Sequence, residues 1–132
     1  MTSPSPGAPF APGSHMIAAY GGGGFAFAGM VHRGSILATP LGVRPIAAAR
    51  VDDLDERTLV ALFAELVERP GSIEFLVIGA GERLAMAPKA LRAALREAGL
   101  RVETMATGPA LRVYNVMQSE NRRVAAALIA AP

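Results

Sequence analysis

The first half of the chain has the apolar pattern of short β-strands. Large and small residues alternate over Phe25–Val31, and Ser35–Thr39 is a second run of strand-forming residues. Between them, His32–Gly34 ends in a glycine that is free to take positive φ, so we predict a hairpin with a short loop there. Val43–Ala48 is expected to be a further short strand, confined to a sheet edge by Pro45.

The second half alternates between helical and strand patterns. Leu59, Leu62, Phe63 and Leu66 follow helical spacing, and Asp53 with Glu56 resembles a capping box in front of them. Ile73–Ile78 is nearly continuous in apolar residues, which predicts a central strand covered on both faces. The remaining predicted elements are a helix from Pro88 to Gly99, a strand over Val102–Met105, a helix from Thr107 to about Asn121 and a strand over Val124–Ala130.

The order of these elements predicts one α/β domain. Alternating helices and strands indicate a sheet with helices packed against it, and the early hairpin makes that sheet mixed. Residues 1–15, rich in Pro, Gly, Ser and Ala, are expected to be a disordered tail, and residues 16–132 to be the domain. The predicted core consists of large apolar residues on the helices and the inner strands: Leu62, Phe63, Leu76, Ile78, Leu95 and Leu128.

Composition narrows the available chemistry. The net charge is only +2 and no basic run occurs, which argues against a nucleic-acid partner. With no cysteine and only 2 histidines, thiolate and multi-histidine metal sites are excluded, and neither a metal nor a cofactor is expected. No apolar run reaches the ~20 residues that span a bilayer, and residues 1–13 lack the basic and apolar parts of a signal peptide. We therefore expect a cytoplasmic protein without a transmembrane segment.

A glycine-rich turn and a helix start form the main candidate site. Gly79 and Gly81 follow the central strand, where glycines let a ligand approach the backbone. The helix that starts at Thr107 offers free N–H groups and a positive dipole end to an anion or carboxylate. The competing interpretation is a tight turn followed by an ordinary capped helix. A dinucleotide site is disfavoured, because Leu84 stands where the third glycine of the G-x-G-x-x-G pattern belongs.

Two polar residues of the same helix, Arg112 and Asn115, could reach this crevice. Asn115 lies at the edge of a predicted apolar face, which consists of Ala110, Val113, Tyr114 and Met117. We expect Asn115 to be mostly buried and to bond loop backbone near Gly79–Gly81 or Gly21–Gly24, because an amide side chain offers both a donor and an acceptor.

The sequence assigns no catalytic residue. His32 is expected in the hairpin turn, without an acidic residue close in sequence that would orient it as a general base. Asp52, Asp53 and Asp55 precede a predicted helix, where they complement its dipole, so we favour that role over a metal site. No serine has the sequence setting of a nucleophile elbow.

Three stretches resemble a small family of domains of unknown function. They are Tyr20–Phe25 with His32–Ser35, Leu76–Gly81, and Thr107–Leu128, the last with Tyr114-Asn115, Glu120, Arg122 and a Val-Ala-Ala-Ala-Leu ending. The family includes the assembly factor of mitochondrial complex I (NADH:ubiquinone oxidoreductase) and single-domain bacterial and archaeal relatives. The resemblance implies a three-layer α/β fold with a mixed central sheet, helices on its faces and an added N-terminal β-hairpin element. It implies no established enzyme activity.

The chain departs from the family pattern at three places. Ala80 and Val113 stand where threonine is usual, and Ile46 lies in a region that often holds tryptophan. The leading hypothesis is a non-enzymatic interaction or assembly domain with an unidentified protein partner, linked to the assembly of a respiratory complex or of membrane proteins. The alternative is a small-molecule or anion-binding domain, or a minor enzyme, that uses the crevice between Gly79–Gly81 and the helix start at Thr107.

Overall fold

The computed structural model describes residues 11–132, which form two β-sheets and three α-helices. The large sheet has the strand order β1-β6-β5-β9-β7-β8, and the small sheet the order β2-β3-β4. The elements in chain order are β1 (Ala11–Pro12), β2 (Ile17–Gly21), β3 (Gly24–Phe27), β4 (Met30–Arg33), β5 (Ile36–Thr39), β6 (Gly42–Pro45), a 3-10 helix (Val51–Asp53), α1 (Val60–Glu68), β7 (Phe75–Gly79), α2 (Lys89–Glu97), β8 (Arg101–Met105), α3 (Thr107–Ser119) and β9 (Val124–Leu128).

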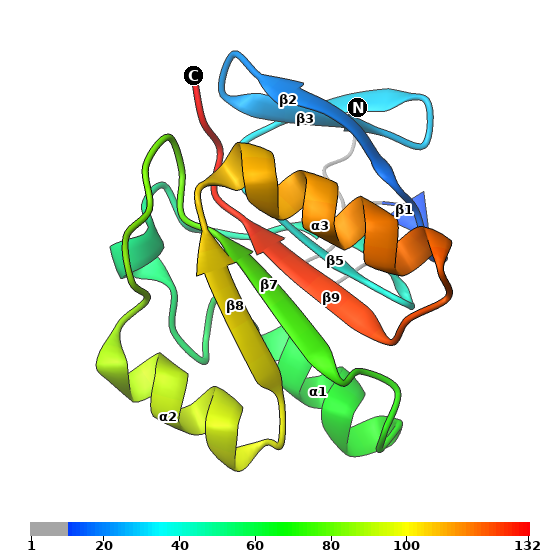
Figure 1. Ribbon diagram of the computed structural model, residues 1–132, viewed down its shortest axis with the longest axis vertical. Helices are drawn as coiled ribbons and strands as arrows, with labels where there is room; N and C mark the ends of the chain where they lie inside the picture. Colours follow the sequence, from blue (N-terminus) through cyan, green and yellow to red (C-terminus); the bar gives the residue numbers. More distant parts are fainter. Residues whose placement is uncertain (1–10) are drawn as a thin grey trace.

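The large sheet is the middle layer of the molecule (Figure 1). Helices α1 and α2 lie on one face, and α3 with the small sheet covers the other. Successive side chains of a strand point to opposite faces, so Leu76 and Ile78 of β7 join the core beside α1 and α2, while Val77 joins the core beside α3. The expected fold class, three-layer α/β with a mixed central sheet, is confirmed.

The strand directions place several chain segments at one edge of the sheet. β7 runs parallel to both β8 and β9, whereas β5 runs antiparallel to β9 and β6. The carboxyl ends of β7, β8 and β9 therefore meet at the same edge, which is where open α/β sheets commonly hold ligands. The turn after Gly79 and the start of α3 at Thr107 both lie there.

The added β element is three-stranded, and its turn differs from the expected one. The turn lies at Ala28–Gly29, with φ angles of 49° and 75°, and joins β3 to β4. Two successive positive φ angles suit a two-residue hairpin turn. The predicted turn at His32 is wrong: His32 lies in β4 opposite Phe25, and Ile36–Thr39 pairs with β9 in the large sheet. The alternation of large and small residues continues through Ala28–Gly29, so no polar break marks the real turn.

The acidic residues before α1 also act differently from expectation. Asp53 Oδ2 accepts a hydrogen bond from the Arg50 N–H (3.0 Å) and closes the 3-10 helix. Thr58 N–H donates to Asp55 Oδ1 (2.7 Å), and Asp55 N–H donates to Thr58 Oγ1 (2.9 Å). The predicted capping box of Asp53 and Glu56 is therefore wrong, because the 3-10 helix uses Asp53 and the reciprocal pair in front of α1 is Asp55 with Thr58.

Five of the six predicted core residues are buried: Leu62, Leu76, Ile78, Leu95 and Leu128. Phe63 packs against the core beside α1 and α2 but is only partly buried. Leu59 at the N-cap of α1 and Leu62 and Glu65 within the helix are the buried residues of this segment. The buried Glu65 accepts a hydrogen bond from the Thr39 hydroxyl (2.6 Å).

The expected tail, residues 1–15, falls mostly outside the described residues. Of its described part, Ala11 pairs with Val43 and Pro12 with Gly42, so regular structure already begins at β1. In the described part of the chain, no helix is long and apolar enough to cross a membrane.

Candidate functional site

Thr107 joins the start of α3 to the turn after β7. Its Oγ1 accepts a hydrogen bond from the Gly81 N–H (2.9 Å) and donates one to the Ile129 carbonyl (2.7 Å). The Thr107 N–H also donates to the Gly81 carbonyl (2.8 Å). Because Thr107 is 0% exposed, its hydroxyl holds three chain segments together and does not face solvent.

Gly79 closes the same junction by packing. A Cβ at this position would lie 2.9 Å from Leu128 Cδ2 and 3.0 Å from Thr107 Cα, so even alanine would not fit without a shift of its neighbours. Gly81 has a φ of +107°, which glycine adopts at little cost. The structure thus brings Gly79, Gly81 and Thr107 together and fills the space between them. A ligand at this edge would have to lie on another side of Gly81.

A cavity of about 440 Å³ adjoins Gly81. The segment that carries Arg50 and Asp52 forms one wall, and the loop that carries Glu82 and Arg83 forms another. All four of these charged residues are exposed, and Arg50 Nη2 lies 3.4 Å from Asp52 Oδ2. Charges of both signs around a small hollow suit a small polar ligand better than an apolar one.

Asn115 and Arg112 lie away from this junction. Asn115 Oδ1 accepts a hydrogen bond from the Ile17 N–H (2.8 Å), and its Nδ2 donates one to the Ile17 carbonyl (2.7 Å). The prediction that Asn115 bonds backbone through both ends of its amide is confirmed. The predicted partner is wrong, since Ile17 belongs to β2 and to neither glycine-rich loop, whereas Asn115 is mostly buried, as expected. Arg112 is exposed on α3.

Tyr114 fixes the segment in front of β2. Its hydroxyl donates to the His15 carbonyl (2.9 Å), and its side chain is 1% exposed. Burial raises the pKa of Tyr114 to about 12, so the phenol stays protonated and acts as a donor at neutral pH. The polar residues Thr107, Tyr114 and Asn115 therefore all hold neighbouring segments against α3.

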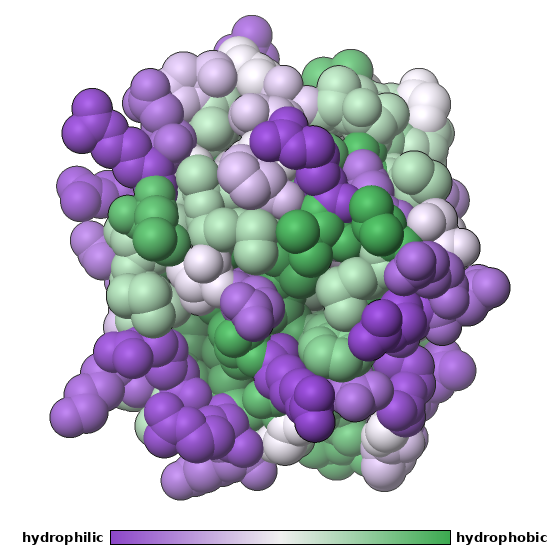
Figure 2. Space-filling view, in the orientation of Figure 1, coloured by the Kyte–Doolittle hydropathy of each residue, from purple (hydrophilic) through white to green (hydrophobic). Residues whose placement is uncertain are grey.

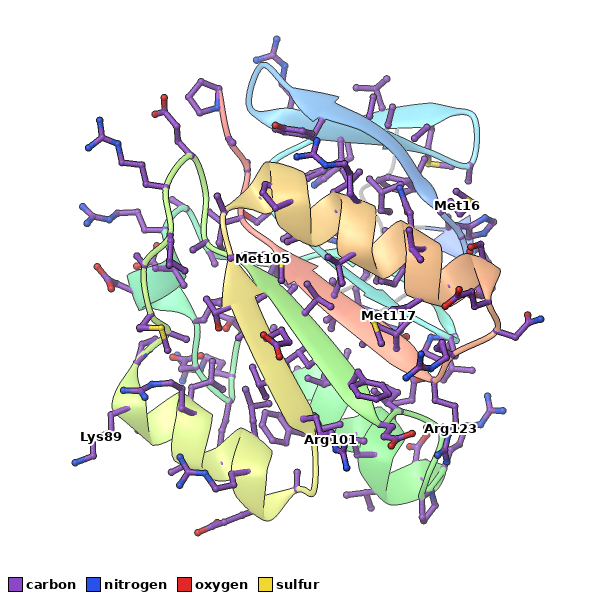
Figure 3. The ribbon with its side chains drawn as sticks, viewed as in Figure 1. Met16, Lys89, Arg101, Met105, Met117 and Arg123 are labelled. Atoms are coloured by element: carbon purple, nitrogen blue, oxygen red, sulfur yellow. The ribbon has the colours of Figure 1, made fainter. Side chains whose placement is uncertain are left out.

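The other flank of α3 leaves an apolar surface beside β8. This α3–β8 surface consists of Phe75, Met105, Val113, Val116 and Met117. Val116 is 56% exposed, and the other four are partly buried. In Figure 2, apolar residues extend across α3 and the strands next to it, with charged residues around them. Figure 3 shows Met117 of α3 and Met105 of β8 on this side of the sheet.

Charged side chains border the α3–β8 surface. Arg101 and Glu103 are exposed on the part of β8 that no helix covers. The guanidinium carbons of Arg101 and Arg122 lie 5.9 Å and 5.0 Å from the centre of the Phe75 ring, within reach of a cation–π interaction. This surface was not predicted from the sequence, although the alternation of Arg101 and Glu103 with less polar residues indicates that one face of β8 meets solvent.

Residues 17–129 match the model of a family described as protein of unknown function (DUF498/DUF598). The chain belongs to this family. It is 38% identical over 120 residues to an uncharacterised protein of Rhodobacter capsulatus, with 91% of this chain and 88% of that protein covered. The matched span contains both the Thr107 junction and the α3–β8 surface.

Solved structures share the fold of this DUF498/DUF598 protein. An outer membrane protein from Bartonella henselae is 40% identical with a TM-score of 0.81, covering 92% of this chain and 99% of that chain. The Rpa2829 protein from Rhodopseudomonas palustris is 43% identical with a TM-score of 0.76, covering 95% and 90%. A Bordetella pertussis protein, described as an Mth938-like domain, is 26% identical with a TM-score of 0.74, covering 98% and 90%.

Proposed function

We propose that this DUF498/DUF598 protein is a non-enzymatic interaction domain that binds a protein partner through the α3–β8 surface. The observation that carries the proposal is the contrast between the two flanks of α3. One flank directs Asn115 to the backbone of β2, and the other presents Val113, Val116 and Met117 beside an uncovered strand. Contiguous apolar side chains with a polar rim are typical of surfaces that contact other proteins.

The hydrogen bonds of Thr107 and Tyr114 support a binding role over catalysis. The Thr107 hydroxyl bonds Gly81 and Ile129, and the Tyr114 hydroxyl bonds the His15 carbonyl. A general acid, base or nucleophile must reach the reacting group of a substrate. These side chains instead contribute to the rigidity of the layers that carry the α3–β8 surface.

The partner class follows from the family resemblance. The resemblance to the mitochondrial complex I assembly factor favours a protein component of a respiratory complex or of another membrane-associated assembly. The rim around Phe75 and Met105 carries Arg101, Arg122 and Glu103, so a matching partner segment would be apolar at its centre and carry both signs of charge around it.

Paired substitutions on opposite sides of the molecule test the proposal. Val116→Asp places a charge in the α3–β8 surface, and Val67→Asp makes the same change at an 80% exposed position of α1. Full-length protein expressed at native level in its host should retain its partner with Val67→Asp and lose it with Val116→Asp. Equal retention by both variants, or no partner for the unsubstituted protein, would contradict the proposal.

The cavity beside Gly81 supports a second candidate function, the binding of a small polar molecule or anion. In this form of the proposal Gly81 borders the ligand, Gly79 and Thr107 shape the edge, and the cations are Arg50 and Arg83. Arg112 and Asn115 would act only indirectly, since neither borders the cavity.

Calorimetric titration with inorganic phosphate and with free glycine tests this second candidate. Saturable binding that is lost in Arg83→Ala and kept in Arg69→Ala, an exposed arginine outside the cavity, would support it. Absence of heat, or equal binding by both variants, would count against it.

A further inference from the structure

The outer edge of β8 carries unused backbone hydrogen-bonding groups. β8 ends the large sheet, and within the described residues β7 is the only strand that pairs with it. The Arg101 N–H donates to the Glu74 carbonyl (3.0 Å), and the ladder to β7 continues through Glu103. Alternate residues of a strand direct their backbone groups to opposite sides, so Val102 and Thr104 direct theirs to the open edge.

Two charges of opposite sign stand next to this edge, and Arg101 also lies over the Phe75 ring. Arg101 and Glu103 point to the same face of β8 and are exposed. Neither has a salt-bridge partner among residues 11–132. Charged residues on an outer strand can serve to discourage pairing with other chains. Here, however, the two charges are spaced so that each could meet its opposite in an identical strand.

We propose that β8 pairs antiparallel with β8 of a second copy of this chain, about a two-fold axis that passes beside Val102. In this register Val102 faces Val102 of the second copy as a hydrogen-bonded pair, which matches the outward direction of its backbone groups. Thr104 lies opposite Leu100 of the copy, where only the Leu100 carbonyl is left for this pair, because the Leu100 N–H donates to the Leu95 carbonyl (3.2 Å). Arg101 then lies directly opposite Glu103 of the copy, twice by symmetry, in the closely spaced non-hydrogen-bonded positions.

Other two-fold registers lack this complementarity. An axis beside Glu103 places the two Glu103 carboxylates directly opposite each other, which is destabilising. An axis beside Thr104 places Glu103 opposite Met105 and leaves Arg101 beyond the pairing region. The positions of Arg101 and Glu103 therefore select the Val102 register over its neighbours.

The other face of β8 adds apolar contact in the same register. A groove of about 220 Å³ lies between β8 and α2, lined in part by Val102, Leu100 and Met86, and Met86 is 55% exposed. A stable interface buries roughly 1,200–2,000 Å² in total, more than two short strand edges supply. The groove lies beside the pairing edge, so it and its copy are placed to add apolar contact to the interface. Arg92 and Arg96 also line the groove, and their long side chains can keep the guanidinium groups in water.

The dimer would add to the proposed function, and its role in partner binding rests on that proposed function. Because α3 lies on the same face as Arg101 and Glu103, the two-fold axis brings two α3–β8 surfaces side by side on one face of a continuous sheet. A partner protein would then meet a doubled platform. The test of the pairing measures only the self-association of this chain. If the protein does not dimerise, the test of partner binding for the proposed function still stands.

Sedimentation equilibrium of the full chain over a concentration series tests the pairing. The unsubstituted protein should form dimers. Glu103→Arg places arginine opposite Arg101 of the copy and should weaken association at least about tenfold. Arg101→Glu combined with Glu103→Arg exchanges the two charges and should restore association. Glu120→Arg, an equal charge change at an exposed position beyond α3, should leave association unchanged.

A second variant tests the backbone groups at the open edge. Thr104→Pro removes one outward N–H and leaves the ladder to β7 intact, so circular dichroism should show a folded protein with weakened association. A protein that is monomeric at every concentration, a Glu103→Arg variant that still forms dimers, or a double variant that stays monomeric would each overturn the pairing.

Discussion

Asn115 connects helix α3 to the small sheet through a single side chain. Its amide satisfies both the N–H and the carbonyl of Ile17, the first residue of β2. The chemistry of this residue could be predicted from its position at the edge of an apolar helix face. Its partner could not be predicted, because Ile17 is 98 residues away in sequence and only the packing of the small sheet on α3 brings the two together.

Replacement of Asn115 should be costly for stability. Asn115→Leu leaves the Ile17 N–H and carbonyl without partners, at about 1–3 kcal/mol each. Asn115→Asp keeps an acceptor for the N–H but loses the donor and places a carboxylate against the Ile17 carbonyl, so it should be similarly harmful. Urea unfolding measures both, with Arg112→Leu as an exposed control on the same helix that should change stability by less than about 0.5 kcal/mol. An unchanged midpoint for Asn115→Leu would show that the amide contributes nothing.

The buried phenol of Tyr114 predicts a dependence of stability on alkaline pH. Its pKa is 10.0 as a reference value and about 12 in the fold, so the folded state favours the protonated form. The stabilisation of the fold by the protonated Tyr114 phenol is fully present below pH 10 and is lost as the pH rises from 10 to 12. Unfolding free energies of the unsubstituted protein and of Tyr114→Phe should therefore converge over this range. A constant difference between them would indicate that the phenol titrates equally in both states.

At the scale of elements, helix α1 shows what periodicity can and cannot determine. The spacing of Leu59, Leu62 and Phe63 predicted a helix, and the structure has one there. Leu62 is buried as expected, but the buried face of the helix is rotated slightly away from Phe63. The buried Glu65 takes an inward position of α1 and bonds Thr39 of a distant strand, while Phe63 is only partly buried. A charged residue on an inward position is hard to foresee from the sequence.

Alanine substitutions at Leu62 and Phe63 should lower the stability of the protein by different amounts. Leu62 is 0% exposed, so Leu62→Ala should cost about 2–5 kcal/mol. Phe63→Ala should fall below the ~3–5 kcal/mol typical of a fully buried ring, since Phe63 is only partly buried. Val67→Ala at an 80% exposed site should stay within about 0.5 kcal/mol of the unsubstituted protein. A larger loss for Phe63→Ala than for Leu62→Ala in thermal unfolding would contradict this orientation of α1.

At the scale of the whole molecule, the layer arrangement was predictable and the surfaces were not. Alternating helices and strands after Asp53 determine the class of fold, and the apolar run before Gly79 identifies the central strand. Strand order, the turn at Ala28–Gly29 and the uncovered flank of β8 depend on contacts between distant segments. The space expected between Gly79 and Thr107 is also filled by a distant segment. Leu128, at the end of β9, packs there, and the following Ile129 carbonyl accepts a hydrogen bond from Thr107.

Site-specific crosslinking tests the proposed function most directly. A photoreactive residue at Val116 samples the α3–β8 surface, and the same residue at Val67 samples the opposite layer. In cells of the native host, the position at Val116 should give an adduct with one protein other than this chain, and Val67 should not give that adduct. The adduct should disappear when Met117→Asp is added, because the charge interrupts the apolar contact. No adduct at Val116, or the same adduct from both positions, would contradict a partner-binding role for this surface.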